Sequence, residues 1–228
     1  MPDLSPGIYL VSTPIGNLGD LSQRQIEILK DCDFIACEDT RRSKNMLFKL
    51  NIKKPLISYH EHNELRRSGT LIEHVLDGKS IAIISDAGTP GISDPAYRVV
   101  SEAVKNEVPI IPIPGPCSII AALVASGLPT DSFVFEGFLP QKGEKRKQKI
   151  QTLLNEERTI VLFESPHRIH KLVNEIYNED AGRLIVIARE LTKMYEEFIR
   201  GTAFEVSQLL NDRKLKGECV VVIDRKIK

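Results

Sequence analysis

The sequence has 228 residues, of which 42% are hydrophobic and 27% are charged. A chain of this length can bury a core without disulfides, and its composition is far from that of a disordered protein. The 31 Lys and Arg residues balance 31 Asp and Glu residues, so the formal net charge is zero. This balance excludes binding driven by overall positive charge, and any contact with a nucleic acid must come from local patches.

Nothing in the sequence predicts export, membrane insertion or a metal site. The first residues lack a basic region followed by an apolar one, and the longest apolar run, Ile119–Ala125, is far shorter than the roughly 20 residues of a membrane span. The four cysteines form no C-x-x-C pair, and the two close histidine pairs have no further ligand beside them. We expect a soluble, cytoplasmic protein with reduced thiols and no bound metal.

The first half of the chain alternates between strand-like and helix-like segments. Leu21, Ile28, Leu29 and Cys32 fall on one helical face, and a second helix is expected over residues 65–76. The expected strands are apolar on both faces, which is typical of a parallel sheet covered by helices. They lie at residues 8–12, 34–37, 56–59, 81–85 and 109–113.

The pattern changes after Pro112–Pro116, where three prolines and Gly115 interrupt any regular element. An entirely apolar helix follows over residues 119–125, and we expect it to be buried at a joint between domains. Further strands are predicted at 133–138, 159–163, 184–188, 197–200 and 218–224, and helices at 143–155, 167–177 and 203–210. The sequence therefore predicts two α/β domains, residues 1–115 and residues 116–228.

Three loops that follow predicted strands are long and rich in glycine and proline: 12–20, 85–95 and 114–118. In open α/β sheets, ligands bind beyond the carboxyl ends of the strands. One such loop is usually only a turn, but three at one edge of a sheet indicate a ligand crevice. The chain has neither a P-loop nor a G-x-G-x-x-G motif, which disfavours an NTPase or a nicotinamide enzyme.

These loops and three further motifs resemble the ribosomal RNA small subunit methyltransferases I, which belong to the tetrapyrrole methylase-like class. The resemblance covers nearly the whole chain, in order, through Thr13–Asp20, Cys37–Arg41, Ser85–Pro95, Ile113–Pro116, Leu162–Arg168 and Ala188–Lys193. It implies a class III methyltransferase fold with S-adenosylmethionine in a cleft between the two domains. It also implies a homodimer that methylates the 2′-oxygen of a cytidine ribose in 16S rRNA of the small ribosomal subunit.

The resemblance implies a set of donor-binding positions in the loops that match the family. The first loop departs from the G-x-G-P-G-[DS] pattern of the tetrapyrrole enzymes, because Pro14, Gly16 and Asp20 are spaced differently. This departure indicates a substrate other than a tetrapyrrole. The expected donor-binding residues are Ser85, Asp86, Ala87, Gly88, Ile92, Cys117, Ser118, Glu164, Ser165 and Leu191.

Transfer of a methyl group to a ribose hydroxyl needs alignment of the oxygen with the donor, and it benefits from a proton acceptor. The candidate acceptors are Glu61, His60 and Asp39, with Glu38 and Glu64 nearby in the sequence. The alternative is that the segment 58–64 is only a solvated helix start, capped by Asn63 or Ser58.

Two basic segments are candidates for phosphate contacts with RNA. Such runs are more often solvated helix faces, so both interpretations stay open. The candidate residues are Arg41, Arg42 and Lys44 in the first segment, and Lys142, Lys145, Arg146 and Lys147 in the second.

Two other functions fit the same sequence. One is a methyltransferase of this fold that acts on a tetrapyrrole, a corrin or a protein side chain, and it would show no dependence on the basic segments. The other is an RNA- or nucleotide-binding module that has lost methyl transfer.

Overall fold

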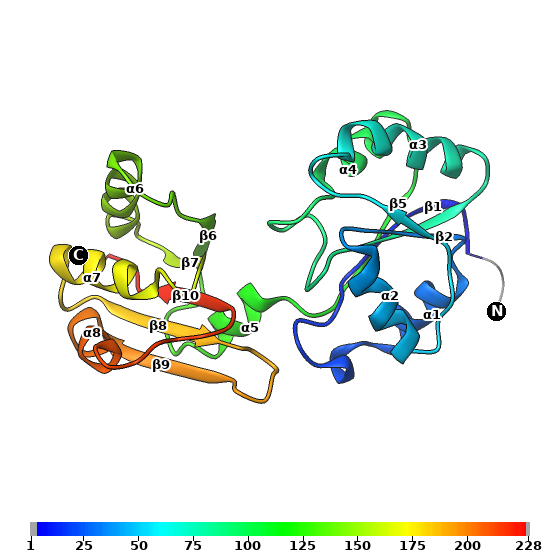
Figure 1. Ribbon diagram of the computed structural model, residues 1–228. Helices are drawn as coiled ribbons and strands as arrows, with labels where there is room; N and C mark the ends of the chain where they lie inside the picture. Colours follow the sequence, from blue (N-terminus) through cyan, green and yellow to red (C-terminus); the bar gives the residue numbers. More distant parts are fainter. Residues whose placement is uncertain (1–3, 227–228) are drawn as a thin grey trace. The chain divides into compact units, whose positions relative to one another are not determined.

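A computed structural model of the chain describes residues 4–226. The chain divides into two compact units, Met1–Cys117 and Ser118–Lys228, and each unit contains a five-stranded sheet (Figure 1). The sequence predicts the division two residues earlier, between residues 115 and 116. We describe each unit by itself.

The first unit is a parallel sheet with helices on both faces, as the sequence predicts. Its strands are β1 (Gly7–Val11), β2 (Phe34–Cys37), β3 (Leu56–Ser58), β4 (Ser80–Ile84) and β5 (Ile110–Ile113), in the order β3-β2-β4-β1-β5. A short 3-10 turn, η1 (Leu18–Asp20), precedes the first helix. Helices α1 (Gln23–Asp31) and α2 (Thr40–Lys49) lie on one face of the sheet, and α3 (Glu64–Leu76) and α4 (Tyr97–Lys105) lie on the other (Figure 1).

Burial on both faces explains why the strands are apolar throughout. In β4, Ile81 and Ile83 pack with the α3 and α4 side of the core, whereas Ala82 and Ile84 pack with the α1 and α2 side. Successive strand residues point to opposite faces, so both sets must be apolar when helices cover both faces. Burying a side chain such as Ile81 stabilises the fold by about 2 kcal/mol.

Side-chain caps set where α1 and α2 begin. Ser22 and Gln25 form a reciprocal capping box at α1, and the Gln25 Nε2 also donates to the Ser12 carbonyl at 2.7 Å. The Asp39 carboxylate accepts a hydrogen bond from the Arg41 backbone N–H and caps α2. Both caps follow directly from loops at the carboxyl edge of the sheet. Neither α2 nor α4 is among the helices that the sequence predicts.

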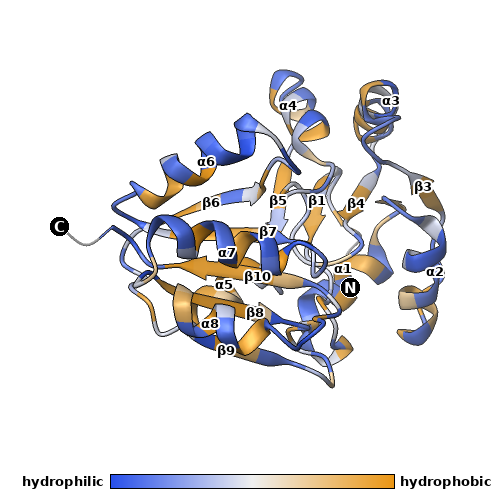
Figure 2. Cartoon of the chain, turned by 60° about the vertical axis from the view of Figure 1, so that its left-hand side comes forward, coloured by the Kyte–Doolittle hydropathy of each residue, from blue (hydrophilic) through white to orange (hydrophobic). Residues whose placement is uncertain are grey.

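The second unit holds a mixed sheet in the order β6-β7-β10-β8-β9, in which only β6 and β7 are parallel. Its strands are β6 (Phe133–Phe138), β7 (Thr159–Glu164), β8 (Leu184–Arg189), β9 (Glu197–Thr202) and β10 (Cys219–Ile223). One apolar core joins the sheet to α6 (Glu144–Leu154), α7 (Ile169–Glu179) and α8 (Ala203–Leu210). Figure 2 shows apolar residues along the central strands and hydrophilic residues along α6 and α7.

Helix α5 (Ser118–Val124) corrects one expectation from the sequence. It contacts β7 and β10, and Ile119, Ala122 and Leu123 are buried. Ile120 and Val124, however, are 45% and 68% exposed, so the helix is not buried all round. One apolar face of α5 therefore packs against the sheet. The other apolar face is exposed to solvent in the described part of a single chain, residues 4–226. No helix in this range is long and apolar enough to cross a membrane.

Candidate functional site

The loops that follow β1 and β4 are joined to each other by backbone pairing. The Thr13 N–H donates to the Gly88 carbonyl at 2.8 Å, and the Gly88 N–H donates to the Thr13 carbonyl at 3.0 Å. The Thr13 hydroxyl donates to the Ser85 carbonyl, and the Ser85 hydroxyl donates to the Gly88 carbonyl, both at 3.0 Å. β1 and β4 are neighbours in the sheet, but their connections run in opposite directions. The chain leads from β1 to β2, on one side of the β4-β1 pair, and from β4 to β5, on the other side. Such a switch point is where open α/β sheets bind ligands.

Glycine is required at two places beside this switch point. Gly88 has a φ of +84°, in the left-handed region that side-chain-bearing residues rarely adopt. At Gly115, a Cβ would collide with the side chains of Gln25 and Ser12. The two glycines let the 85–95 and 114–118 loops approach the loop after β1 closely, as the glycine and proline content predicts.

Three carboxylates, Glu38, Asp86 and Asp94, form an acidic group at this edge. Burial and, after it, the charges of Glu38 and Asp86 together raise the pKa of Asp94 to about 6. Burial also raises the pKa of Glu38, with further contributions from Asp86 and Glu61. The negative charge of Asp86 is partly neutralised, because its carboxylate lies 3.1 Å from the Arg42 guanidinium and accepts a hydrogen bond from the Asp39 N–H. The acidic group therefore favours a positively charged ligand.

A cavity of about 560 Å³ opens beside the acidic group. Its lining combines residues predicted for three roles: the candidate proton acceptors Asp39 and His60, the candidate RNA-binding residues Arg41 and Arg42, and the expected donor-binding residue Asp86. The complete lining is Glu38, Asp39, Thr40, Arg41, Arg42, His60, His62 and Asp86. Lys44 is exposed on α2, and the side chain of Glu61 is 77% exposed, with His62 at 3.5 Å.

The candidate proton acceptors differ in how free each one is to take up a proton. Two hydrogen bonds from the Arg41 side chain hold the pKa of Asp39 well below its usual range, which makes Asp39 a weak base. The Asn63 Oδ1 accepts from the His60 backbone N–H, so the Asn63 Nδ2 faces the His60 ring and lies 3.1 Å from its Nε2. The Nε2 lone pair of His60 is therefore occupied. Glu38 remains as the carboxylate best suited to accept a proton in this cavity.

In the second unit, the structure corrects the expectation for Arg146. This residue was expected to contact RNA, but its side chain is only 1% exposed and pairs with Glu164 and Glu175. Its neighbours Lys142, Lys145 and Lys147 are exposed, as a basic surface requires. The Glu164 carboxylate is enclosed as well, so only the backbone of this expected donor-binding residue is left for a ligand.

The turn after β8 has a strained backbone around Leu191, which the sequence assigned to donor binding. Glu190 and Thr192 have φ values of 50° and 65°, although neither is glycine. Lys193 holds the turn through ion pairs of 2.8 Å to Glu190 and 2.9 Å to Glu218. The hydroxyl of Thr192 is buried without a hydrogen-bond partner. Strain of this kind is concentrated at ligand sites, and it persists only where the surroundings enforce it.

The remaining expected positions are spread over both units. Ala87 and Ile92 are exposed in the loop after β4. Cys117 and Ser118 are half-buried at the end of the first unit and the start of α5. Asp94 is not among the residues predicted for the site, and its only signal in the sequence is its place within the 85–95 loop. Within residues 4–226, no cluster of three or more His, Cys, Asp or Glu residues is placed to hold a metal ion.

Comparison with known proteins identifies one family across most of the chain. The model of the tetrapyrrole (corrin/porphyrin) methylases matches residues 7–207. A ribosomal RNA small subunit methyltransferase I from Halalkalibacterium halodurans is 44% identical over 95% of this chain and 75% of that protein. The protein of the same name from Synechocystis is 46% identical over 95% of this chain and 78% of that protein.

Solved structures show the same fold at low sequence identity. A uroporphyrin-III C-methyltransferase from Thermus thermophilus has a TM-score of 0.67 and 18% identity, covering 95% of this chain and 94% of that chain. A cobalt precorrin-4 methyltransferase of cobalamin biosynthesis has a TM-score of 0.69 and 16% identity, with the same coverage.

Proposed function

Because the chain belongs to the tetrapyrrole methylase family and, within it, to the ribosomal RNA small subunit methyltransferases I, we propose that it methylates small-subunit ribosomal RNA. The methyl donor is S-adenosylmethionine, and the acceptor is the ribose 2′-oxygen of a cytidine in 16S rRNA. The observation that carries this proposal is 44–46% identity over 95% of the chain to two enzymes of that name. Low identity to the tetrapyrrole enzymes supports a shared fold and not a shared substrate.

The acidic group fits this donor. S-adenosylmethionine supplies a methyl carbon bonded to a positively charged sulfur, and it also carries an ammonium group and ribose hydroxyls. Asp86 and Asp94 lie in the loop expected to bind it, and Glu38 is beside that loop at the end of β2. Partly buried carboxylates with raised pKa values gain most from a cationic ligand, because it offsets their mutual repulsion.

The same geometry supports a role for Glu38 in the transfer step. The 2′-oxygen forms a bond to the methyl carbon as the carbon–sulfur bond breaks, and the hydroxyl proton must leave. Glu38 lines the cavity and has a raised pKa, so its carboxylate suits the role of proton acceptor better than Asp39. Alignment of the oxygen with the methyl group contributes further, as in other group-transfer enzymes.

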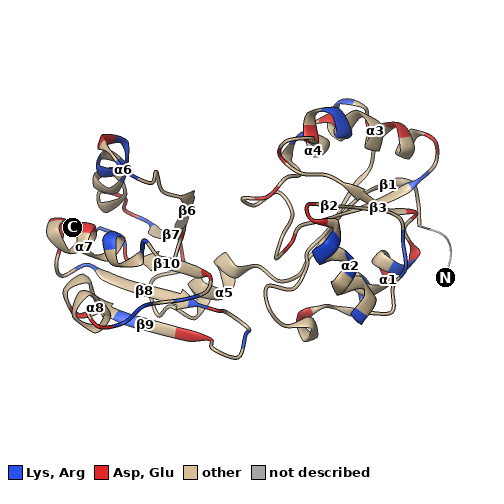
Figure 3. Cartoon of the chain, in the orientation of Figure 1, with Lys and Arg blue, Asp and Glu red and all other residues tan. Residues whose placement is uncertain are grey.

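Exposed cations supply the RNA contacts in this proposal. Arg41 and Arg42 line the cavity with side chains that are 88% and 72% exposed. Lys142, Lys145 and Lys147 are exposed at the start of α6, where Figure 3 shows a concentration of positive charge. Such side chains would bind backbone phosphates and orient a loop of RNA, with an affinity that falls steeply as salt rises.

We also propose that the enzyme is a cytoplasmic homodimer that acts on 16S rRNA or on the small subunit. The open apolar face of α5, with Ile120 and Val124, supports a second chain as its cover. Light scattering should give a dimer mass for the wild type and a monomer mass for Ile120→Glu/Val124→Glu.

The proposed function is tested by labelled methyl transfer to small ribosomal subunits isolated from a strain that lacks this gene. The expected product is one ribose-methylated cytidine, identified by mass analysis of the rRNA fragments. Complementation should restore the same modification in cells. An unchanged set of ribose methyl groups in the deletion strain, with no label transferred in vitro, would falsify the proposal.

A further inference from the structure

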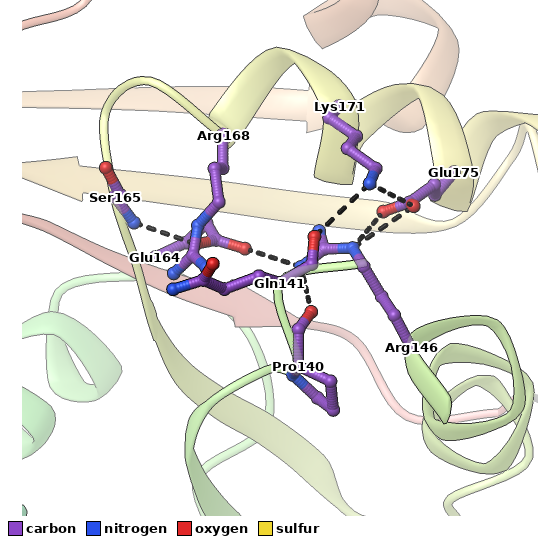
Figure 4. Close-up of polar contacts among 8 residues, drawn as sticks. All are labelled: Pro140, Gln141, Arg146, Glu164, Ser165, Arg168, Lys171 and Glu175. Atoms are coloured by element: carbon purple, nitrogen blue, oxygen red, sulfur yellow. Dashed lines mark hydrogen bonds and ion pairs between the residues drawn. The ribbon is translucent and has the colours of Figure 1, made fainter. Parts of the chain in front are cut away.

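Arg146 lies at the centre of a buried network of charges in the second unit (Figure 4). Its Nη1 donates to the Glu164 carboxylate at 3.1 Å, and its Nε donates to Glu175 at 2.8 Å. Arg168 approaches the other oxygen of Glu164 at 2.7 Å. Two guanidinium groups therefore hold one carboxylate that is fully enclosed, while Glu175 on α7 is 28% exposed.

The network fixes the two loops that leave the parallel strands β6 and β7. Glu164 is the last residue of β7, and one of its oxygens accepts a hydrogen bond from the Ser165 N–H at 2.8 Å. On the other side, the Arg146 Nη1 donates to the Pro140 carbonyl at 3.0 Å, in the loop before α6. Lys171 of α7 donates to the carbonyl of Gln141 in the same loop. A single set of side chains thus orients the turn Ser165–Arg168 and the loop before α6.

Stability alone does not explain such a network. Burying charged groups costs several kcal/mol each, and well-packed apolar residues of similar volume often stabilise a protein equally well or better. The Arg146 Nη2 is buried without any hydrogen-bond partner, so the network is not optimal even as a set of hydrogen bonds. What charged side chains provide here, and apolar ones do not, is a fixed direction for the Ser165 N–H and for the turn that follows.

We propose that Arg146 is a positioning residue for the methyl donor, which acts by holding Glu164 and thereby the Ser165–Arg168 turn. The inference rests on the proposed function, because that turn is expected to contact S-adenosylmethionine. Arg146 therefore affects binding of the donor and makes no contact with RNA, although it lies within a basic run of the sequence.

The test compares two variants with a matched control on the exposed face of α6. In Arg146→Met/Glu164→Met, the two fully enclosed charges are replaced together, and the charges that lose a partner, Arg168 and Glu175, are both partly exposed to solvent. Arg146→Lys keeps the positive charge but removes the guanidinium group that donates to Glu164 through Nη1 and to Glu175 through Nε. Gln148→Met, two residues after Arg146 and on the exposed face of α6, is the control. Donor affinity is measured by calorimetry with S-adenosylmethionine, and unfolding by urea.

We expect both network variants to bind the donor at least tenfold more weakly than the wild type, with an increased KM for the donor and a smaller change in kcat. Their RNA affinity should keep the salt dependence of the wild type, and Gln148→Met should match the wild type throughout. A folded double variant or a folded Arg146→Lys with donor affinity within twofold of the wild type would show that the network is only structural. Should the wild type itself fail to bind the donor, the proposed function fails, which is a distinct result.

Discussion

Replacing Asp94 by Asn should make the protein more stable at neutral pH while weakening donor binding. The fold raises the pKa of Asp94 from an ordinary 3.8 to about 6 through burial and through the charges of Glu38 and Asp86. Well below pH 3.8 the carboxyl is protonated in both the folded and the unfolded chain, so its charge does not affect stability. Between these two pKa values the unfolded chain releases the proton and the folded chain keeps it, so stability falls as pH rises.

The magnitude follows from the size of this shift. A shift of about two pKa units corresponds to about 3 kcal/mol once pH exceeds the folded pKa. Asp94 is only partly buried, and screening by solvent reduces this figure to about 1–2 kcal/mol. Asn has nearly the same shape and no charge, so Asp94→Asn should gain that amount at neutral pH and almost nothing near pH 4.

Urea unfolding of the wild type and Asp94→Asn, at about pH 4 and about pH 7.5, measures this difference directly. Asp77→Asn, at the end of α3 and thus at the opposite edge of the sheet from the acidic group, controls for a general effect of charge. Calorimetry at the higher pH should show weaker binding of S-adenosylmethionine by Asp94→Asn. The reasoning is refuted if Asp94→Asn is less stable than the wild type at neutral pH, or if its effect is the same at both pH values.

Three further predictions concern other parts of the molecule. Glu38→Gln should lower kcat about 10²-fold or more at saturating donor, beyond any weaker donor binding that follows from its place in the acidic group; single-turnover transfer assays at saturating donor measure this, and an unchanged rate would remove Glu38 from the reaction. Lys145→Gln should reduce the slope of log affinity against log salt by about 0.7 for a single-stranded RNA, and filter binding at several salt concentrations checks it. Leu162→Ala, in the core of the second unit, should reduce the free energy of unfolding by about 2–5 kcal/mol, whereas Ile160→Val should reduce it by about 1 kcal/mol, as urea titrations would show.

Much of the fold could be predicted because its strands are apolar on both faces and its turns are rich in glycine and proline. Helices α2 and α4 were missed for different reasons. The charged residues after Asp39 were interpreted as a patch that binds RNA, so the helix that they form, α2, was not predicted. Asp39 is nevertheless a favourable N-cap residue, which was a signal for a helix start. In α4, the β-branched residues Val99, Val100 and Val104 weaken the helical signal. The apolar residues of α4 nevertheless recur on one face of the helix, so its periodicity was a usable signal, whereas α2 buries only Ser43 and Leu47.

The candidate site was predictable where chemistry lies in a loop and not where it depends on partners from distant segments. Arg146 could have been recognised as buried, because it shares the spacing of Ile150, Leu153 and Leu154 on one face of α6. Its partner Glu164 lies 18 residues away, so no local pattern reveals the ion pair. The raised pKa of Asp94 likewise depends first on burial and then on the charge of Glu38, which follows β2 and comes to the same edge of the sheet through the pairing of β2 with β4.

The position of β10 in its sheet has a consequence for how the second unit is made. Residues Cys219–Ile223 pair with β7 on one side and β8 on the other, so the strand that is translated last occupies the middle of the sheet. Until β10 is synthesised, the backbone N–H and C=O groups of β7 and β8 that pair with it have no strand partner. Exposed strand edges of this kind can pair incorrectly or bind chaperones. A nascent chain halted before residue 219 should therefore be readily cleaved by protease throughout this unit, while the sheet and helices of the first unit already resist digestion.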